Sequence, residues 1–89
     1  MTWVCYLLKC ADNTLYCGIT NDLNKRLAAH NSQDGAKYTR SRIPVELVFF
    51  EVCDDRSSAS KRELQIKKLS RARKLSLIKS HDDVSSTIG

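Results

Sequence analysis

The stretch WVCYLLKCADNTLYCGIT, from Trp3 to Thr20, decides the fold of this chain of 89 residues. Its first part, Trp3–Cys10, is almost wholly apolar, which is typical of a β-strand that is covered on both faces. The turn-forming residues Ala11–Thr14 follow, and Leu15–Thr20 returns to an extended pattern. The sequence therefore predicts a β-hairpin near the start of the chain.

A helix is expected directly after the hairpin. Asn21 or Asp22 can cap it, and it runs to about Asn31. On this helix Arg26 and His30 are four residues apart, so both side chains lie on the same face.

A loop and a third strand come next. Residues 32–44 are expected to form a loop, because Gly35, Ser41 and Pro44 interrupt regular structure. Val45–Val52 is rich in β-forming residues and is expected to be a strand that Pro44 opens.

Two more helices are expected in the last third of the chain. The first runs to about Leu69, and a shorter one capped by Ser70 runs to about Lys79. The residues able to cap the first are Asp54, Asp55, Ser57 and Ser58. The chain is therefore expected to hold one α+β domain over residues 1–79 and a polar, flexible C-terminal tail over residues 80–89.

Composition excludes several classes of protein. Hydrophobic residues make up 42% of the chain and charged residues 28%, which excludes a disordered or collagen-like polymer. The longest apolar runs, Trp3–Leu8 and Leu47–Phe50, are far shorter than the roughly 20 residues that a membrane span needs. No secretory signal is recognisable, so the protein is expected in the cytoplasm and not in a membrane.

The cysteines are expected to be small buried core residues with free thiols. None of them forms a C-x-x-C pair, and neither His30 nor His81 stands at a zinc-finger spacing from them. Disulfide bonds and a structural zinc site are therefore the less favoured roles of the four cysteines, Cys5, Cys10, Cys17 and Cys53.

Positive charge gathers in two segments. Between Lys61 and Lys79 stand eight bases and the single acid Glu63, a net charge of +7. A smaller basic group, which comprises Lys37, Arg40 and Arg42, surrounds Tyr38. Nucleic-acid backbones are natural partners for such a charge distribution, although a merely solvated helical face is the alternative. The candidate DNA-binding residues are Lys25, Lys37, Tyr38, Arg40, Lys67, Lys68, Arg71 and Lys74.

Glu63 is the one acid in the basic segment, and its position is unusual. On a helical wheel it lies only about 40° from Ala59, at the border of the apolar stripe. It can be the i, i+4 ion-pair partner of Lys67. Alternatively it can be a ligand of a divalent cation such as Mg²⁺, which binds one carboxylate together with waters and substrate phosphates.

Other side chains suit phosphodiester cleavage. Arg26 can bond two phosphate oxygens at once, which a lysine cannot do. Tyr6 or Tyr16 could orient or deprotonate a water molecule if nearby positive charge lowers the hydroxyl pKa; each is otherwise an ordinary half-buried sheet residue.

Several spaced motifs resemble the GIY-YIG nuclease superfamily over residues 3 to about 79, and in particular its short, stand-alone bacterial branch, the YhbQ-like proteins. The motifs are Val4-Cys5-Tyr6, then after a gap of nine residues Tyr16-Cys17-Gly18, then Ile19 to Leu27, His30-Asn31, Gly35 to Arg40, Pro44 to Val48 and Glu63-x-x-Ile66-Lys67-Lys68-Leu69. Val4, Cys5 and Cys17 depart from the motif at packing positions.

The resemblance implies a three-stranded antiparallel sheet flanked by helices, the GIY-YIG fold. It also implies one catalytic site that requires one Mg²⁺ or Mn²⁺ ion and leaves a 5′-phosphate and a 3′-hydroxyl. Tyr6 would activate the water, Arg26 would stabilise the phosphate and Glu63 would hold the metal. Tyr16 and His30 would position groups or relay protons, and Gly18 would let the backbone approach closely.

Two functions remain open on the sequence. The first is a metal-dependent DNA endonuclease, monomeric, with weak sequence preference of its own and a possible protein partner that supplies the target. The second is a nucleic-acid-binding or adaptor module that keeps the fold and has lost useful catalysis.

Overall fold

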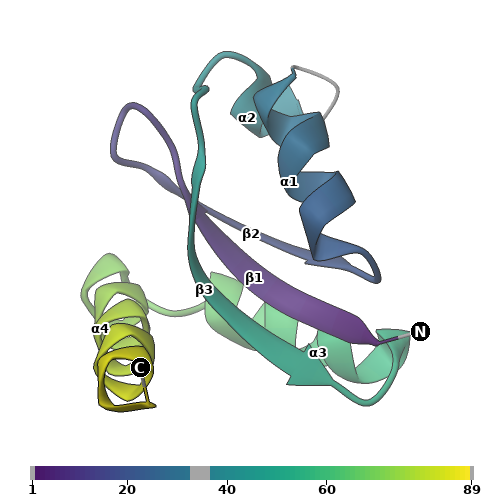
Figure 1. Cartoon of the computed structure of the whole chain (residues 1–89), viewed down its shortest axis with the longest axis vertical. Helices are drawn as coiled ribbons and strands as arrows, with labels where there is room; N and C mark the ends of the chain where they lie inside the picture. Colours follow the sequence, from purple (N-terminus) through teal and green to yellow (C-terminus); the bar gives the residue numbers. More distant parts are fainter. Residues whose placement is uncertain (1, 33–36, 89) are drawn as a thin grey trace.

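The computed structural model describes residues 2–32 and 37–88, with side chains described as far as His81. A three-stranded antiparallel sheet is the centre of the structure (Figure 1). Its strands are β1 (Trp3–Lys9), β2 (Leu15–Thr20) and β3 (Glu46–Cys53), arranged in the order β2-β1-β3. The expected α+β architecture is confirmed.

The hairpin forms as its sequence predicts. β1 and β2 pair so that Tyr6 lies opposite Gly18, and β1 pairs on its other side with β3, where Tyr6 lies opposite Phe50. As the central strand, β1 is buried from Val4 to Leu8, which explains why its sequence is apolar without alternation.

Aspartates cap two of the helices. In α1 (Leu23–Asn31) the Asp22 carboxylate accepts a hydrogen bond from the Lys25 amide at 3.1 Å. In α3 (Arg56–Lys67) the Asp55 carboxylate accepts one from the Ser58 amide at 2.8 Å. These bonds satisfy amides that have no partner inside the helix.

The segment expected to be a loop contains a short helix, α2 (Lys37–Arg40). Its sequence carries no helical apolar pattern. Contacts with other segments stabilise it, among them the contact of the buried Thr39 with His30. Residues 33–36, which include Gly35 of the sequence motif, lie outside the described part of the chain.

The last helix is longer than expected: α4 (Arg71–Ile88) continues past Lys79. Leu77 and Ile78 pack against the core, and the His81 ring meets the rings of Phe49 and Phe50 edge-on at 5.5 and 5.0 Å. These contacts stabilise the helix beyond the predicted end. That residues 80–89 are flexible stays a prediction.

The sheet carries one apolar cluster on each face. On the face that α3 and α4 cover, the buried cluster comprises Cys5, Leu7, Cys17, Phe49 and Ile66. On the other face, where Leu23 and Leu27 of α1 pack, it comprises Tyr6, Leu8, Cys10 and Val45. Three of the four cysteines are thus core residues, as expected, and Cys53 is half-buried. No helix in the described part of the chain is long and apolar enough to cross a membrane.

We expect Ile66→Ala to lower the free energy of unfolding by about 2–5 kcal/mol, because Ile66 is fully buried and its truncation leaves a cavity. Urea denaturation measures the change. Leu64→Ala is the matched control on the same helix, since Leu64 is 57% exposed and its truncation should cost less than about 0.5 kcal/mol. Equal losses in the two variants would contradict this description of the core.

Candidate active site

Two buried side chains meet where α1 packs on the central strand. Tyr6 of β1 is 1% exposed and His30 of α1 is fully buried, and the Tyr6 hydroxyl lies 3.1 Å from His30 Nε2. Leu23 and Leu27 anchor α1 on the sheet, so His30 reaches the sheet from the end of the same helix. Each of the two polar groups thereby obtains a partner away from water.

Arg26, one turn before His30, supplies positive charge to this pair. Burial raises the pKa of Tyr6 to about 12, and the nearby Arg26 guanidinium opposes the rise. Burial, and to a smaller degree the charge of Arg26, lowers the pKa of His30. At neutral pH the site therefore holds a protonated tyrosine, a neutral imidazole and a cation.

The hairpin partner of Tyr6 leaves room for its hydroxyl. A Cβ atom at Gly18 would lie 2.6 Å from the Tyr6 hydroxyl oxygen and 2.8 Å from Cζ, closer than real Cβ atoms approach. A glycine at this position is thus required by the tyrosine itself. Tyr16, two residues earlier on β2, brings its ring edge-on to His30, with the centroids 5.3 Å apart.

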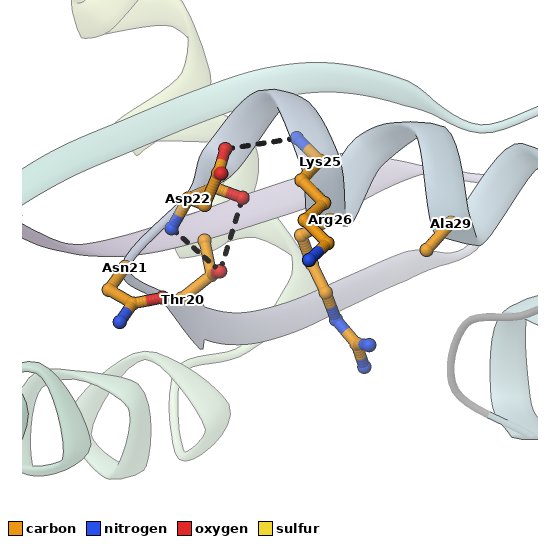
Figure 2. Close-up of a pocket in the computed structure, with 6 residues that line it drawn as sticks. All are labelled: Thr20, Asn21, Asp22, Lys25, Arg26 and Ala29. Atoms are coloured by element: carbon orange, nitrogen blue, oxygen red, sulfur yellow. Dashed lines mark hydrogen bonds between the residues drawn. The ribbon is translucent and has the colours of Figure 1, made fainter.

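A pocket of about 250 Å³ lies beside Arg26 (Figure 2). Asp22 is held at its rim by the capping bond and by Thr20, whose hydroxyl accepts a bond from the Asp22 amide at 3.1 Å. The Arg26 side chain extends away from α1 (Figure 2), and Lys25 also lines the pocket. Two cations at one pocket suit an anionic group such as a phosphate.

Two residues of α2 extend the site. Thr39 is fully buried, and its hydroxyl lies 2.7 Å from Nδ1 of His30. Its neighbour Tyr38 is 39% exposed and stacks on Tyr16, with the ring centroids 5.7 Å apart. The sequence places Tyr38 among the DNA-binding candidates and Thr39 within the Gly35–Arg40 motif. It does not predict the contact of Thr39 with His30, because that contact depends on α2 packing against α1.

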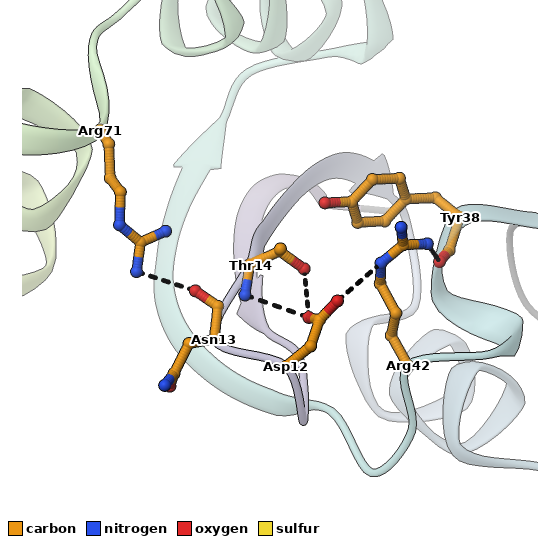
Figure 3. Close-up of polar contacts among 6 residues, drawn as sticks. All are labelled: Asp12, Asn13, Thr14, Tyr38, Arg42 and Arg71. Atoms are coloured by element: carbon orange, nitrogen blue, oxygen red, sulfur yellow. Dashed lines mark hydrogen bonds and ion pairs between the residues drawn. The ribbon is translucent and has the colours of Figure 1, made fainter.

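Arg42 fastens α2 to the hairpin turn (Figure 3). Its guanidinium forms an ion pair with Asp12 at 3.0 Å, donates to the Tyr38 carbonyl at 2.8 Å and lies 4.2 Å from the centre of the Tyr38 ring. The charge pattern of the sequence places Arg42 with the other bases near Tyr38. In the structure Arg42 instead forms an ion pair with Asp12.

Glu63 lies on α3, which covers the opposite face of the sheet. Its side chain is 22% exposed and forms an ion pair with Lys67 at 3.6 Å, so the i, i+4 interpretation of the sequence is confirmed. The structure brings Tyr6, Tyr16, Arg26 and His30 together on the α1 face and leaves Glu63 on the helix of the other face. α3 contacts both the central strand β1 and the edge strand β2.

Glu63 is the residue to which the resemblance of the sequence assigns a metal ion. The described residues contain no group of three or more His, Cys, Asp or Glu side chains that could hold an ion. A single, partly exposed carboxylate nevertheless fits Mg²⁺, which retains waters and is commonly held by one or two carboxylates and substrate phosphates.

The candidate DNA-binding residues form two separate groups. Lys25, Lys37, Tyr38 and Arg40 belong to α1 and α2, and all four are exposed. Lys67, Lys68, Arg71 and Lys74 stand at the junction of α3 and α4, and all but the half-buried Lys74 are exposed. Arg71 also donates to the Asn13 carbonyl of the hairpin turn at 2.8 Å (Figure 3).

Residues 2–76 of the chain match the model of the GIY-YIG catalytic domain. The chain belongs to the GIY-YIG family. Its membership assigns it to a nuclease family with nucleic acid as the substrate class, as the motifs of the sequence imply.

Individual relatives share most of their length with this chain. The UPF0213 protein DP2720 of Desulfotalea psychrophila is 53% identical over 87 residues, which cover 97% of this chain and 79% of the relative. The UPF0213 protein CPE1444 of Clostridium perfringens is 56% identical over 75 residues, covering 84% and 81%. The solution NMR structure of the protein EF2693 from E. faecalis has 39% sequence identity and a TM-score of 0.62, covering 90% of this chain and 85% of that one.

We expect the high pKa of Tyr6 to affect stability in alkali. Between pH 10 and about 12 the folded chain retains a proton that the unfolded chain has lost, so the contribution of Tyr6 is complete below pH 10 and lost as the pH rises. Urea denaturation of the wild type and of Tyr6→Phe at a series of pH values isolates this contribution. Within this pH window the stability of the wild type relative to the variant should decrease. A constant difference up to pH 12 would contradict the prediction.

Proposed function

We propose that this chain is a divalent-metal-dependent DNA endonuclease that hydrolyses phosphodiester bonds in one step to 5′-phosphate and 3′-hydroxyl ends. The observation that carries the proposal is the buried Tyr6 hydroxyl held between a neutral His30 and the cation Arg26. Core packing alone needs neither a buried imidazole nor a guanidinium at this place, since burying polar groups costs free energy.

The arrangement suits removal of a proton from water. The Tyr6 hydroxyl can pass its proton to His30 Nε2 while its oxygen takes one from the attacking water. The new P–O bond forms as the P–O3′ bond breaks, and the 3′-oxygen takes up a proton from solvent. Arg26 favours the transient phenolate by its charge, against the burial that disfavours it.

Arg26 also suits the phosphate. Its planar guanidinium can donate two hydrogen bonds to the non-bridging oxygens, where negative charge builds up during attack. Lys25 shares the pocket and can hold the neighbouring phosphate of the strand. Tyr16, packed between His30 and Tyr38, positions these rings.

Glu63 is proposed as the residue that holds one Mg²⁺ or Mn²⁺ ion. Bound there, the ion supplies charge stabilisation to the phosphate and its leaving oxygen. Because β2 is the edge strand, a DNA strand crossing this edge can approach Arg26 on one face and Glu63 on the other. The basic residues of α2 and of the α3–α4 junction then serve as contacts for the DNA backbone on either side.

The proposal extends to target choice, oligomeric state and location. Sequence preference is expected to be weak, with a protein partner able to supply the target, and the enzyme is expected to act as a cytoplasmic monomer.

The alternative is a nucleic-acid-binding module without useful catalysis. The ion pair between Glu63 and Lys67 favours it, because a carboxylate neutralised by a lysine needs no metal. Cleavage assays on labelled single-stranded, duplex and branched DNA, with Mg²⁺, Mn²⁺ or EDTA, separate the two functions.

We expect Arg26→Lys to lower kcat by about 10²- to 10³-fold, because lysine keeps the charge but cannot bond two phosphate oxygens together. Steady-state cleavage under saturating DNA measures it. Arg73→Lys is the matched control. Because Arg73 is an exposed residue of α4, this variant should retain wild-type activity. Cleavage by Arg26→Lys within a few-fold of the wild type would refute the role given to Arg26.

We expect Glu63→Gln to abolish cleavage and its response to added metal while DNA binding persists or tightens. Loss of the partly exposed ion pair should cost only about 0–1 kcal/mol of stability, so the thermal midpoint should change little. Glu46→Gln is the control, because Glu46 is an exposed carboxylate at the start of β3. An active Glu63→Gln enzyme with unchanged metal dependence would contradict the proposed metal site.

A further inference from the structure

Thr39 is the polar residue at the inner end of a chain of contacts that begins at Tyr6. The Tyr6 hydroxyl lies 3.1 Å from His30 Nε2, and the Thr39 hydroxyl lies 2.7 Å from His30 Nδ1. All three residues are at most 1% exposed, so bulk water does not exchange freely with these bonds.

The direction of these hydrogen bonds follows from the groups around the Tyr6 hydroxyl. The hydroxyl carries one proton that needs an acceptor, and the nearby Arg26, whose positive charge acts on Tyr6, has only N–H donors. Among the described contacts of the Tyr6 hydroxyl, the group that can accept its proton is then His30 Nε2. Every buried side-chain nitrogen or oxygen in the described part of the chain has a partner, which agrees with this assignment.

A neutral imidazole carries one proton, on one nitrogen or the other. With Nε2 as an acceptor, the proton of His30 must be on Nδ1, and the atom that receives it is Oγ1 of Thr39. We propose that Thr39 is a positioning residue: its hydroxyl oxygen accepts the Nδ1 proton of His30 and keeps Nε2 available to the Tyr6 hydroxyl.

The backbone around Thr39 is held in place independently of this bond. The Arg42 amide donates to the Thr39 carbonyl at 2.9 Å, and the Arg42 guanidinium donates to the Tyr38 carbonyl at 2.8 Å. The same guanidinium is tied to Asp12 in the hairpin turn (Figure 3). A helix of four residues can therefore present one hydroxyl at a defined place.

Loss of the acceptor has a specific consequence. Without an oxygen at Oγ1, the Nδ1 proton is buried without a partner, which costs free energy. The other tautomer avoids this cost but directs an N–H group at the Tyr6 hydroxyl, so the tyrosine proton loses its acceptor. The tautomer follows from the contacts alone, whereas its effect on cleavage rests on the proposed function.

The test is the tautomer of His30, measured by long-range ¹H–¹⁵N NMR of the ring nitrogens at neutral pH, without DNA or metal. Wild type and Thr39→Ser should both show a protonated Nδ1 and an unprotonated Nε2. In Thr39→Val, which keeps the shape and removes the hydroxyl, the Nδ1-protonated form should become the minor one. His81, which packs on Phe49 and Phe50, is the internal control and should not change.

A wild-type His30 protonated on Nε2 would overturn the proposal. Because this measurement uses the wild-type chain, it does not depend on whether a variant folds. An unchanged tautomer in folded Thr39→Val would overturn it as well. In cleavage assays Thr39→Val should lower kcat by about 10²-fold with little change in KM, and Thr39→Ser should restore most of the rate. If the wild type shows the expected tautomer and cleaves no DNA, the proposed function fails while the role of Thr39 in setting the tautomer stands.

Discussion

The hydrogen bond between the Tyr6 hydroxyl and His30 Nε2 joins the central strand to the first helix, and the rest of the site is arranged around it. A buried phenol and a buried imidazole are each costly unless both are hydrogen-bonded. Their pairing therefore limits what the neighbouring residues can be. Gly18 must lack a side chain for the hydroxyl to fit, and the second nitrogen of His30 must find a partner of its own, which is Thr39.

The same interaction shows why a small chain can hold a buried polar site. The apolar residues Leu23 and Leu27 dock α1 on the sheet, and the polar residues Arg26 and His30 follow on the adjoining face of the helix. One helix thereby supplies both the packing energy and the functional groups. On the opposite face of the sheet, α3 and α4 enclose a purely apolar cluster around Ile66, so the larger part of the core is independent of the site.

Much of the architecture could be predicted because it depends on local pattern. The apolar run of β1, the turn after it and the aspartate caps of α1 and α3 are short-range features, and the structure reproduces them. The prediction was incomplete where distant segments stabilise an element. α2 is held by the ion pair of Arg42 with Asp12 in the hairpin turn, and α4 is extended by the packing of His81 on two phenylalanines. Neither contact has a periodic signature in the sequence.

For the site, the sequence by itself determined which chemical groups are available: two strand tyrosines, an arginine and a histidine one turn apart, and one acid in a basic segment. It also determined that Arg26 and His30 share a helix face, since that follows from helical geometry. Only the tertiary structure decided that the Tyr6 hydroxyl meets His30, that Thr39 contacts the other ring nitrogen of His30, and that the helix of Glu63 covers the opposite face of the sheet. The reason is physical: spacing along the chain specifies the neighbours within one helix or strand, whereas contacts between elements depend on how their apolar faces pack together.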